Sequence, residues 1–134
     1  MIIDSSYLFD LMAGDPAAFS KGAELVDDGE MQWLPTPVVA EAYYGVATAR
    51  SETTEQEVRN RLLGYPRIDV DEEIARTAGM LLAEADDADD AVGGEAGVGP
   101  NDAYIAAMAA ILDDAVLTDN VDDFQTLGVA VEPY

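Results

Sequence analysis

The chain has 134 residues, of which 49% are apolar, and this predicts one folded domain over residues 1–134. It contains no cysteine and no histidine, which excludes disulfides, thiolate metal sites and catalysis by Ser-His-Asp or Cys-His groups. Its 28 acidic and 6 basic residues give a net charge of −22, so the folded chain repels itself at ordinary salt concentrations.

Short apolar segments alternate with longer amphipathic ones along the chain. The apolar segments predict strands at residues 1–4, 31–35, 67–70, 115–118 and 129–133. The amphipathic segments, with their start and stop residues, predict helices at 5–14, 15–29, 36–50, 53–65, 71–90, 101–113 and 120–127. Pro16 and Pro37 fit the first turns of two of these helices, with Thr36 as a cap. The glycine-rich stretch 91–100 predicts a loop.

This alternation predicts an α/β fold, a three-layer α/β/α sandwich with a short central parallel sheet. In such folds, ligands bind beyond the carboxyl ends of the strands. Asp4 and Asp119 each follow a predicted strand, so we expect both side chains at that edge of the sheet.

Four carboxylates stand in unusually apolar surroundings. Asp4 follows "MII", Glu41 lies within "PVVAEAYYGVA", Asp102 opens "NDAYIAAMAA", and Asp119 follows "VLT". Burying several ionised carboxylates together is very costly unless a cation lies among them. Mg²⁺ or Mn²⁺ prefers oxygen ligands, and such a site suits hydrolysis of phosphodiesters.

Each of these residues also has a simpler interpretation. Asp4 fits the N-cap of a helix, and Asp102 fits a helix start favoured by the helix dipole. Glu41 fits a pair with Arg50 or a position facing solvent, and Asp119 fits a turn. The four together, in this order, favour a shared site.

The order "MIIDSS", "TPVVAEAYYGV", "GPNDAYIAAMA", "LTDNVDDF" resembles a PIN domain over essentially the whole chain. Within that family it is most similar to the VapC-type toxins of toxin–antitoxin pairs. The resemblance implies an endoribonuclease that hydrolyses RNA with Mg²⁺ or Mn²⁺ and leaves a 5′-phosphate.

By the same resemblance, Asp4 and Asp102 match the first and third acids of the family and are expected to hold metal. Glu41 matches the second acid, as a metal ligand or an anchor for a metal-bound water. The fourth position departs from the family's usual Thr-x-Asp, because this chain has Asp119 followed by Asn120. We expect these two to contribute together, with Asp122 as an alternative source of charge. Ser6 and Thr118 resemble the hydroxyls that help to orient the acids.

Other interpretations of acids at strand ends fit less well. A receiver domain needs an acidic pair after its first strand and a lysine after its last, whereas Lys21 is the sole lysine here. A phosphatase of the haloacid dehalogenase type needs Asp-x-Asp, and this chain has Asp-Ser-Ser. A catalytically degenerate PIN-like domain that only binds a protein stays open, because of Asn120.

The resemblance to a toxin implies RNA as substrate and an antitoxin that masks the acidic site. A basic side chain of the antitoxin is one way in which it could do so. Similar toxins form homodimers, for which the "EAYYGV" segment is a candidate surface, although core packing is an alternative. Three arginines in "ARSETTEQEVRNR" are a candidate edge facing RNA or antitoxin, unless they pair with neighbouring glutamates.

The acidic, lysine-poor composition resembles that of proteins from salt-loving archaea, where molar salt screens the repulsion. An acidic protein that binds a basic partner is the alternative. The longest apolar run, at 104–112, is far shorter than the roughly 20 residues of a membrane span, so no membrane association is expected. No secretory signal is visible, and the absence of cysteine favours a cytoplasmic location.

Overall fold

A computed structural model describes residues 1–48, 53–88 and 97–134. The ends of two expected helices, at 49–50 and 89–90, and most of the expected loop lie outside these residues. The strands are β1 (Ile2–Ile3), β2 (Leu34–Pro35), β3 (Arg67–Ile68), β4 (Val116–Leu117) and β5 (Val131–Glu132). The helices are α1 (Ser5–Ala13), α2 (Pro16–Asp27), α3 (Thr36–Thr48), α4 (Glu55–Leu62), α5 (Glu72–Ala88), α6 (Pro100–Leu112) and α7 (Val121–Thr126).

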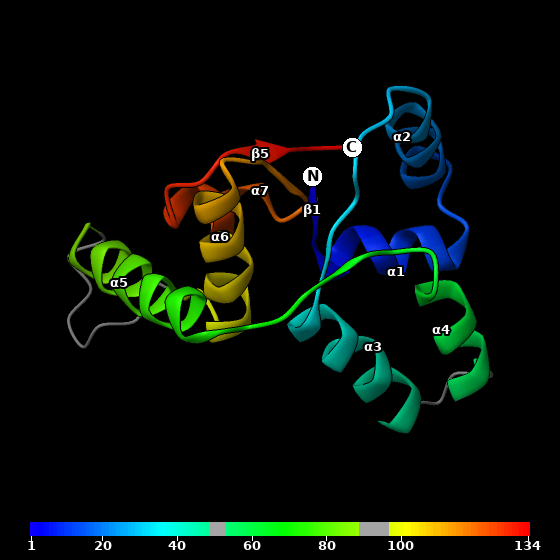
Figure 1. Ribbon diagram of the computed structural model, residues 1–134, viewed down its shortest axis with the longest axis horizontal. Helices are drawn as coiled ribbons and strands as arrows, with labels where there is room; N and C mark the ends of the chain where they lie inside the picture. The colour runs from blue at the N-terminus through cyan, green and yellow to red at the C-terminus, as the bar shows by residue number, and fades with distance from the viewer. Residues whose placement is uncertain (49–52, 89–96) are drawn as a thin grey trace.

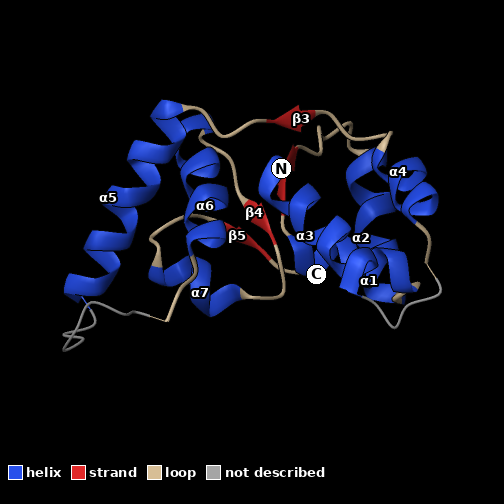
Figure 2. Cartoon of the chain, turned by 90° about the horizontal axis from the view of Figure 1, so that it is seen from below, coloured by secondary structure: helices blue, strands red, loops and turns tan. Residues whose placement is uncertain are grey.

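All of these strands run parallel. One sheet has the order β1-β4-β5, and β2 pairs with β3 in a second. A bridge between Ile2 and Trp33 joins the two sheets, with backbone hydrogen bonds on both sides of it. The strands lie between α5, α6 and α7 on one side and α1 to α4 on the other (Figures 1 and 2). The expected α/β fold with a short parallel sheet is confirmed, although the helices dominate it.

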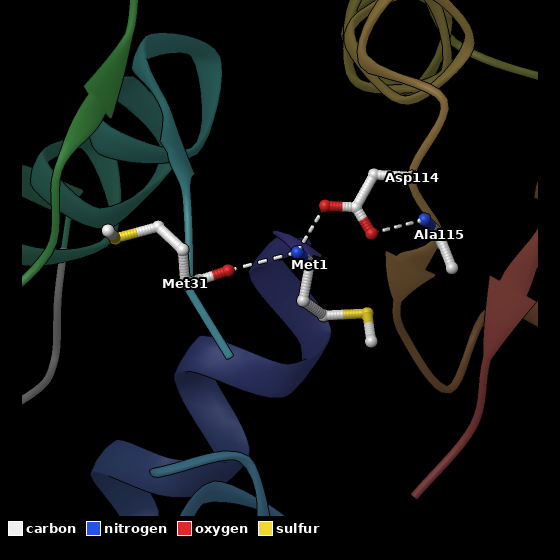
Figure 3. Close-up of polar contacts among 4 residues, drawn as sticks. All are labelled: Met1, Met31, Asp114 and Ala115. Carbon is white, nitrogen blue, oxygen red and sulfur yellow. Dashed lines mark hydrogen bonds and ion pairs between the residues drawn. The ribbon is translucent and has the colours of Figure 1, made fainter. Parts of the chain in front are cut away.

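The amino group of Met1 fastens the start of β1 to two other segments (Figure 3). It donates a hydrogen bond to the carbonyl oxygen of Met31 at 2.9 Å and forms an ion pair with Asp114. The other carboxylate oxygen of Asp114 accepts from the Ala115 amide at 2.8 Å. Since Met31 precedes β2 and Ala115 precedes β4, this contact sets the positions at which both neighbouring strands begin.

The core is one apolar cluster around the strands and α6. Ile2, Ile3 and Leu117 are fully buried, and α6 buries most of its length because its small alanines let other elements approach closely. One face of α5 packs against this core, with Ile74, Ala78 and Ala85 buried. No helix in the described parts of the chain has both the length and the apolar character that a membrane span requires.

Local signals set most of the helix ends. Gly14 ends α1 with φ +83°, and the Asp15 side chain caps α2 by accepting from two backbone N–H groups. Most of the expected boundaries were wrong by one to three residues, and two of these differences concern the starts of helices. Thr36 is the first residue of α3 and not its cap, and Pro100 begins α6 and does not end the loop before it. Proline is favoured at the first helical position, where its missing N–H has no helical partner.

The single lysine fastens the last strand to α2. The Nζ of Lys21 lies 2.5 Å from Oε1 of Glu132 in β5 and 3.1 Å from Oε1 of Glu24. These two carboxylates raise the pKa of Lys21, whose side chain is only 12% exposed.

We expect Lys21→Met to lower stability by about 1 kcal/mol, or roughly 3–4 °C in Tm, because it removes this bridge and retains the aliphatic stem. Thermal unfolding followed by circular dichroism measures this. Glu132→Gln should have the larger effect and Glu24→Gln almost none, because Glu24 is the more exposed partner. Equal effects of the two glutamine variants would contradict the assignment.

Candidate active site

Asp4 is a buried carboxylate between β1 and α1, and it is only 2% exposed. It occupies the N-cap of α1, but its side chain makes no capping hydrogen bond. Its Oδ2 instead accepts from the hydroxyls of Thr118 at 2.7 Å and Ser6 at 2.9 Å. The helix-cap interpretation of this side chain is therefore wrong. The carboxylate is held by two hydroxyls that come from opposite ends of the chain.

Strand pairing explains why these residues meet. β1 and β4 are parallel with Ile3 opposite Leu117, so the next residues, Asp4 and Thr118, lie side by side beyond the sheet edge. The hydroxyls of Ser6 and Thr118 are 3.1 Å apart and accept from the amides of Asp119 and Asn120. The turn after β4 is thereby fixed to the start of α1.

Asp102 lies in the first turn of α6, as both interpretations of it predicted. Burial, followed by the charges of Asp4, Asp123 and Glu41, raises the pKa of its carboxyl to about 6, against the lowering effect of a hydrogen bond from the Gly99 backbone. The favourable end of the helix dipole does not offset these effects. Asp4, Asp123 and Glu41 therefore each lie near enough to Asp102 for their charges to act on its carboxyl.

Glu41 reaches this region from α3. Its Oε1 accepts a hydrogen bond from Nδ2 of Asn101 at 3.0 Å, which links α3 to the start of α6. The alternative partner Arg50 lies outside the described residues. Glu41 is half-buried and its hydrogen bond to Asn101 is exposed, so this contact also fits a side chain at a helix edge that faces solvent.

The turn after β4 contributes its backbone more clearly than its side chains. Asp119, Asn120 and Asp122 are exposed, and the Asn120 side chain does not cap α7. Asp123 is the acid of this segment that acts on Asp102, and the sequence analysis missed it. The available signal was its position one turn before buried Leu127, which places it on the inward face of α7.

The carboxylates of Asp4, Glu41 and Asp123 act on that of Asp102, but they do not form a ready-made metal site. Within the described residues, no three acidic side chains are close enough together to hold a metal ion as they stand. The described arginines and the lysine also form no ion pair with Asp4, Glu41, Asp102 or Asp123. Within residues 1–48, 53–88 and 97–134, the negative charge of these acids is therefore not balanced by an ion pair.

An apolar groove of about 330 Å³ begins one helical turn from these acids, between α1, α3 and α4. Phe9 in its wall is one turn along α1 from Ser5, and Gly45 is one turn along α3 from Glu41. Arg61 of α4 closes the far end and donates a hydrogen bond to the Met12 carbonyl at 3.0 Å.

The raised pKa of Asp102 predicts a pH-dependent loss of stability. The folded carboxyl titrates at about 6 and the unfolded one near 3.8, so the folded state binds more protons between these values. This contribution to stability is full below about pH 3.8 and is lost as the pH rises through 6. In EDTA at pH 7.5, we expect Asp102→Asn to be more stable than the unmodified protein by about 1–2 kcal/mol. Urea unfolding measures this; the difference should vanish near pH 4, and a less stable variant at pH 7.5 would contradict the prediction.

The sequence matches the PIN domain family over residues 1–129. The chain belongs to the PIN domain family. This confirms the predicted resemblance to the PIN domain family.

Solved structures support the same PIN fold. A chain of VapBC2 from Rickettsia felis, bound to a DNA fragment from the promoter, matches with TM-score 0.77 and 18% identity, covering 99% of this chain and 97% of that one. FitAcB from Neisseria gonorrhoeae matches with TM-score 0.76 and 21% identity, covering 97% of this chain and 94% of that one. VapBC-1 from nontypeable Haemophilus influenzae matches with TM-score 0.72 and 20% identity, covering 98% of this chain and 96% of that one. No curated protein matches this PIN domain.

Proposed function

We propose that this PIN domain is the toxin of a toxin–antitoxin pair and a metal-dependent endoribonuclease that hydrolyses RNA phosphodiester bonds. The observation that carries the proposal is the buried Asp4 carboxylate, whose charge acts on Asp102 as do those of Asp123 and Glu41. In the described parts of the chain, no basic side chain forms an ion pair with any of these four acids. Such a concentration of carboxylates is stabilised by a divalent cation.

The residues fit Mg²⁺ or Mn²⁺, both of which take oxygen ligands. Asp4, Asp102 and Glu41 would hold the ion, which would draw their carboxylates closer together. Both hydroxyl contacts of Asp4 at normal distance go to Oδ2, and Oδ1 has only a 3.4 Å contact with Ser5, so Oδ1 is available to a cation. Bound Mg²⁺ or Mn²⁺ supplies polarisation of the scissile phosphate and an activated water at neutral pH.

The remaining roles belong to the protein. Ser6 and Thr118 fix the orientation of Asp4, and Asn101 fixes that of Glu41. Asp119 and Asn120 complete the site from the turn that these hydroxyls hold. We add Asp123 as a further acid because of its effect on Asp102.

The partners follow from the same proposal. The solved relatives are VapBC and FitAB toxin–antitoxin complexes, and this supports an antitoxin partner for the present chain. The groove beside the acids offers an apolar bed for an antitoxin segment whose basic side chain would reach the acids. For a homodimer, α3 offers Tyr44, which is 71% exposed. A source in a salt-loving archaeon is proposed from the acidic composition.

Incubation with total RNA in 2 M KCl tests the function directly. We expect fragments with 5′-phosphate ends in the presence of Mg²⁺ or Mn²⁺, and none in EDTA. Binding to a co-expressed antitoxin without any cleavage, at every metal tested, would instead indicate the degenerate binding domain.

The two neighbouring acids of α7 offer a matched test of the site's composition. We expect Asp123→Asn to reduce cleavage about tenfold or more, because Asp123 lies in the field of Asp102, and Asp122→Asn to leave it within about twofold. Both changes remove one negative charge from the same helix. Single-turnover cleavage rates measure the difference. A larger loss of cleavage in Asp122→Asn would show that Asp122, and not Asp123, is the additional acid of the site.

A further inference from the structure

The last strand ends at the same edge of the sheet as the acidic site. Leu117 pairs with Glu132, and the amide of Thr118 donates to the Glu132 carbonyl at 3.2 Å. The residues that follow β5 therefore leave the sheet beside Thr118, which holds Asp4. Lys21 secures Glu132 from the α2 side and makes no contact with the acids of the site.

Tyr134 connects this segment to the first turns of α1. Its hydroxyl donates to Oδ2 of Asp10 at 2.7 Å, and its ring meets the fully buried Tyr7 edge-on, with centroids 5.3 Å apart and planes at 74°. Asp10 lies four residues after Ser6, so the two share a face of α1 one turn apart. The phenol thus lies one helical turn from the hydroxyl that orients Asp4.

The charges around the phenol keep it protonated. Burial raises the pKa of Tyr134, the hydrogen bond to Asp10 and the charge of Asp119 raise it further, and the nearby Ser6 side chain lowers it. Asp10 and Ser6 face it from α1, and Asp119 faces it from the turn after β4. Tyr134 therefore stays a hydrogen-bond donor at physiological pH and contacts α1, while the charge of Asp119 in the turn after β4 acts on it.

We propose that Tyr134 is a positioning residue for Asp4. By bonding Asp10 and packing on Tyr7, it fixes the first turns of α1, so that the Ser6 hydroxyl stays directed at Oδ2 of Asp4. This inference rests on the proposed metal-dependent function, because it assigns Tyr134 an effect on metal affinity. Nothing in the sequence pattern marked this tyrosine.

Tyr134→Phe tests the inference, because phenylalanine retains the ring packed on Tyr7 and loses the hydroxyl. Groups that directly orient metal ligands are worth about 10–100-fold in metal affinity. Since Tyr134 acts through Ser6, we expect Mn²⁺ to bind about 3- to 10-fold more weakly, measured by calorimetry or by the electron paramagnetic resonance signal of free Mn²⁺. The Mn²⁺ concentration for half-maximal cleavage should rise by the same factor, with KM for RNA unchanged at saturating Mn²⁺. Asp10→Ala, which removes the acceptor, should give the same shift.

Lys21→Met is the matched control, because Lys21 secures the same strand through Glu132 from the α2 side and forms its ion pairs with Glu24 and Glu132, not with the acids of the site. It should lower Tm and leave Mn²⁺ affinity unchanged. Equal Mn²⁺ affinity in Tyr134→Phe and the unmodified protein would overturn the inference. An equal loss of Mn²⁺ affinity in Lys21→Met would also overturn it, because Tyr134 would then act only by holding the last strand in place. If the unmodified protein binds Mn²⁺ but cleaves no RNA, the proposed function fails, and the affinity ratio still decides the role of Tyr134. If it binds no Mn²⁺, both proposals fail.

Discussion

Asp4→Asn should abolish metal-dependent RNA cleavage, by about 10³-fold or more, while the domain remains folded. The amide removes the negative charge that faces the proposed cation. With its oxygen in the place of Oδ2, the amide still accepts from Thr118 and Ser6, and its NH₂ group takes the place of Oδ1 beside the Ser5 hydroxyl. Cleavage rates over a range of Mn²⁺ concentrations, with circular dichroism of the folded state, measure both parts.

A second readout of Asp4→Asn does not depend on activity. The charge of Asp4 raises the pKa of Asp102, so that pKa should fall toward its ordinary value in the variant, as carboxyl NMR shifts would report. Asp28→Asn is the matched control, because it removes one charge from an exposed position at the end of α2. An unchanged pKa of Asp102 would show that the two acids do not share a site, and full activity of Asp4→Asn would remove the basis of the nuclease proposal.

Much of the fold is predictable from local signals. Gly14, Asp15 and Pro16 mark the end of one helix and the start of the next, and short apolar segments mark all of the observed strands. The strand pairing is not predictable in the same way, because each strand has only two paired residues and the alternation of side chains carries no register. The order of strands depends on tertiary contacts such as that of Met1 with Met31 and Asp114.

The acids of the candidate site also differ in how well they can be predicted from the sequence. Asp4, Glu41 and Asp102 are recognisable because a carboxylate within an apolar segment is costly and needs a reason. Asp123 was hidden within an acidic run, where only the burial of Leu127 one turn later distinguishes it from exposed Asp122. Tyr134 is brought close to α1 by the pairing of β5 with β4, and this pairing cannot be predicted from the order of elements along the chain.

Raising KCl from 0.1 M to 2 M should raise Tm by about 15 °C. The net charge of −22 on 134 residues means that folding brings many like charges together, and few basic side chains offset them. The Debye length falls from about 10 Å at 0.1 M to about 3 Å at 1 M, so the repulsion between surface acids is largely removed. Relief of about 4–5 kcal/mol corresponds to this shift for a domain of this size. Thermal unfolding in EDTA, which removes divalent metal from the comparison, measures it.

Charge reversal separates screening from a general effect of concentrated solutes. Asp27→Lys, Asp28→Lys and Glu84→Lys change exposed acids that lie away from the candidate site, and two of them place a cation at the C-terminal end of α2, which the helix dipole favours. The triple variant should be more stable than the unmodified protein at 0.1 M KCl and should gain less from 2 M KCl, because less repulsion remains to be screened. Sucrose at equal osmolality should raise Tm in both proteins alike. If the triple variant gains as much from KCl as the unmodified protein, then exclusion of salt from the surface stabilises the fold and the acidic surface is not the reason that it needs salt.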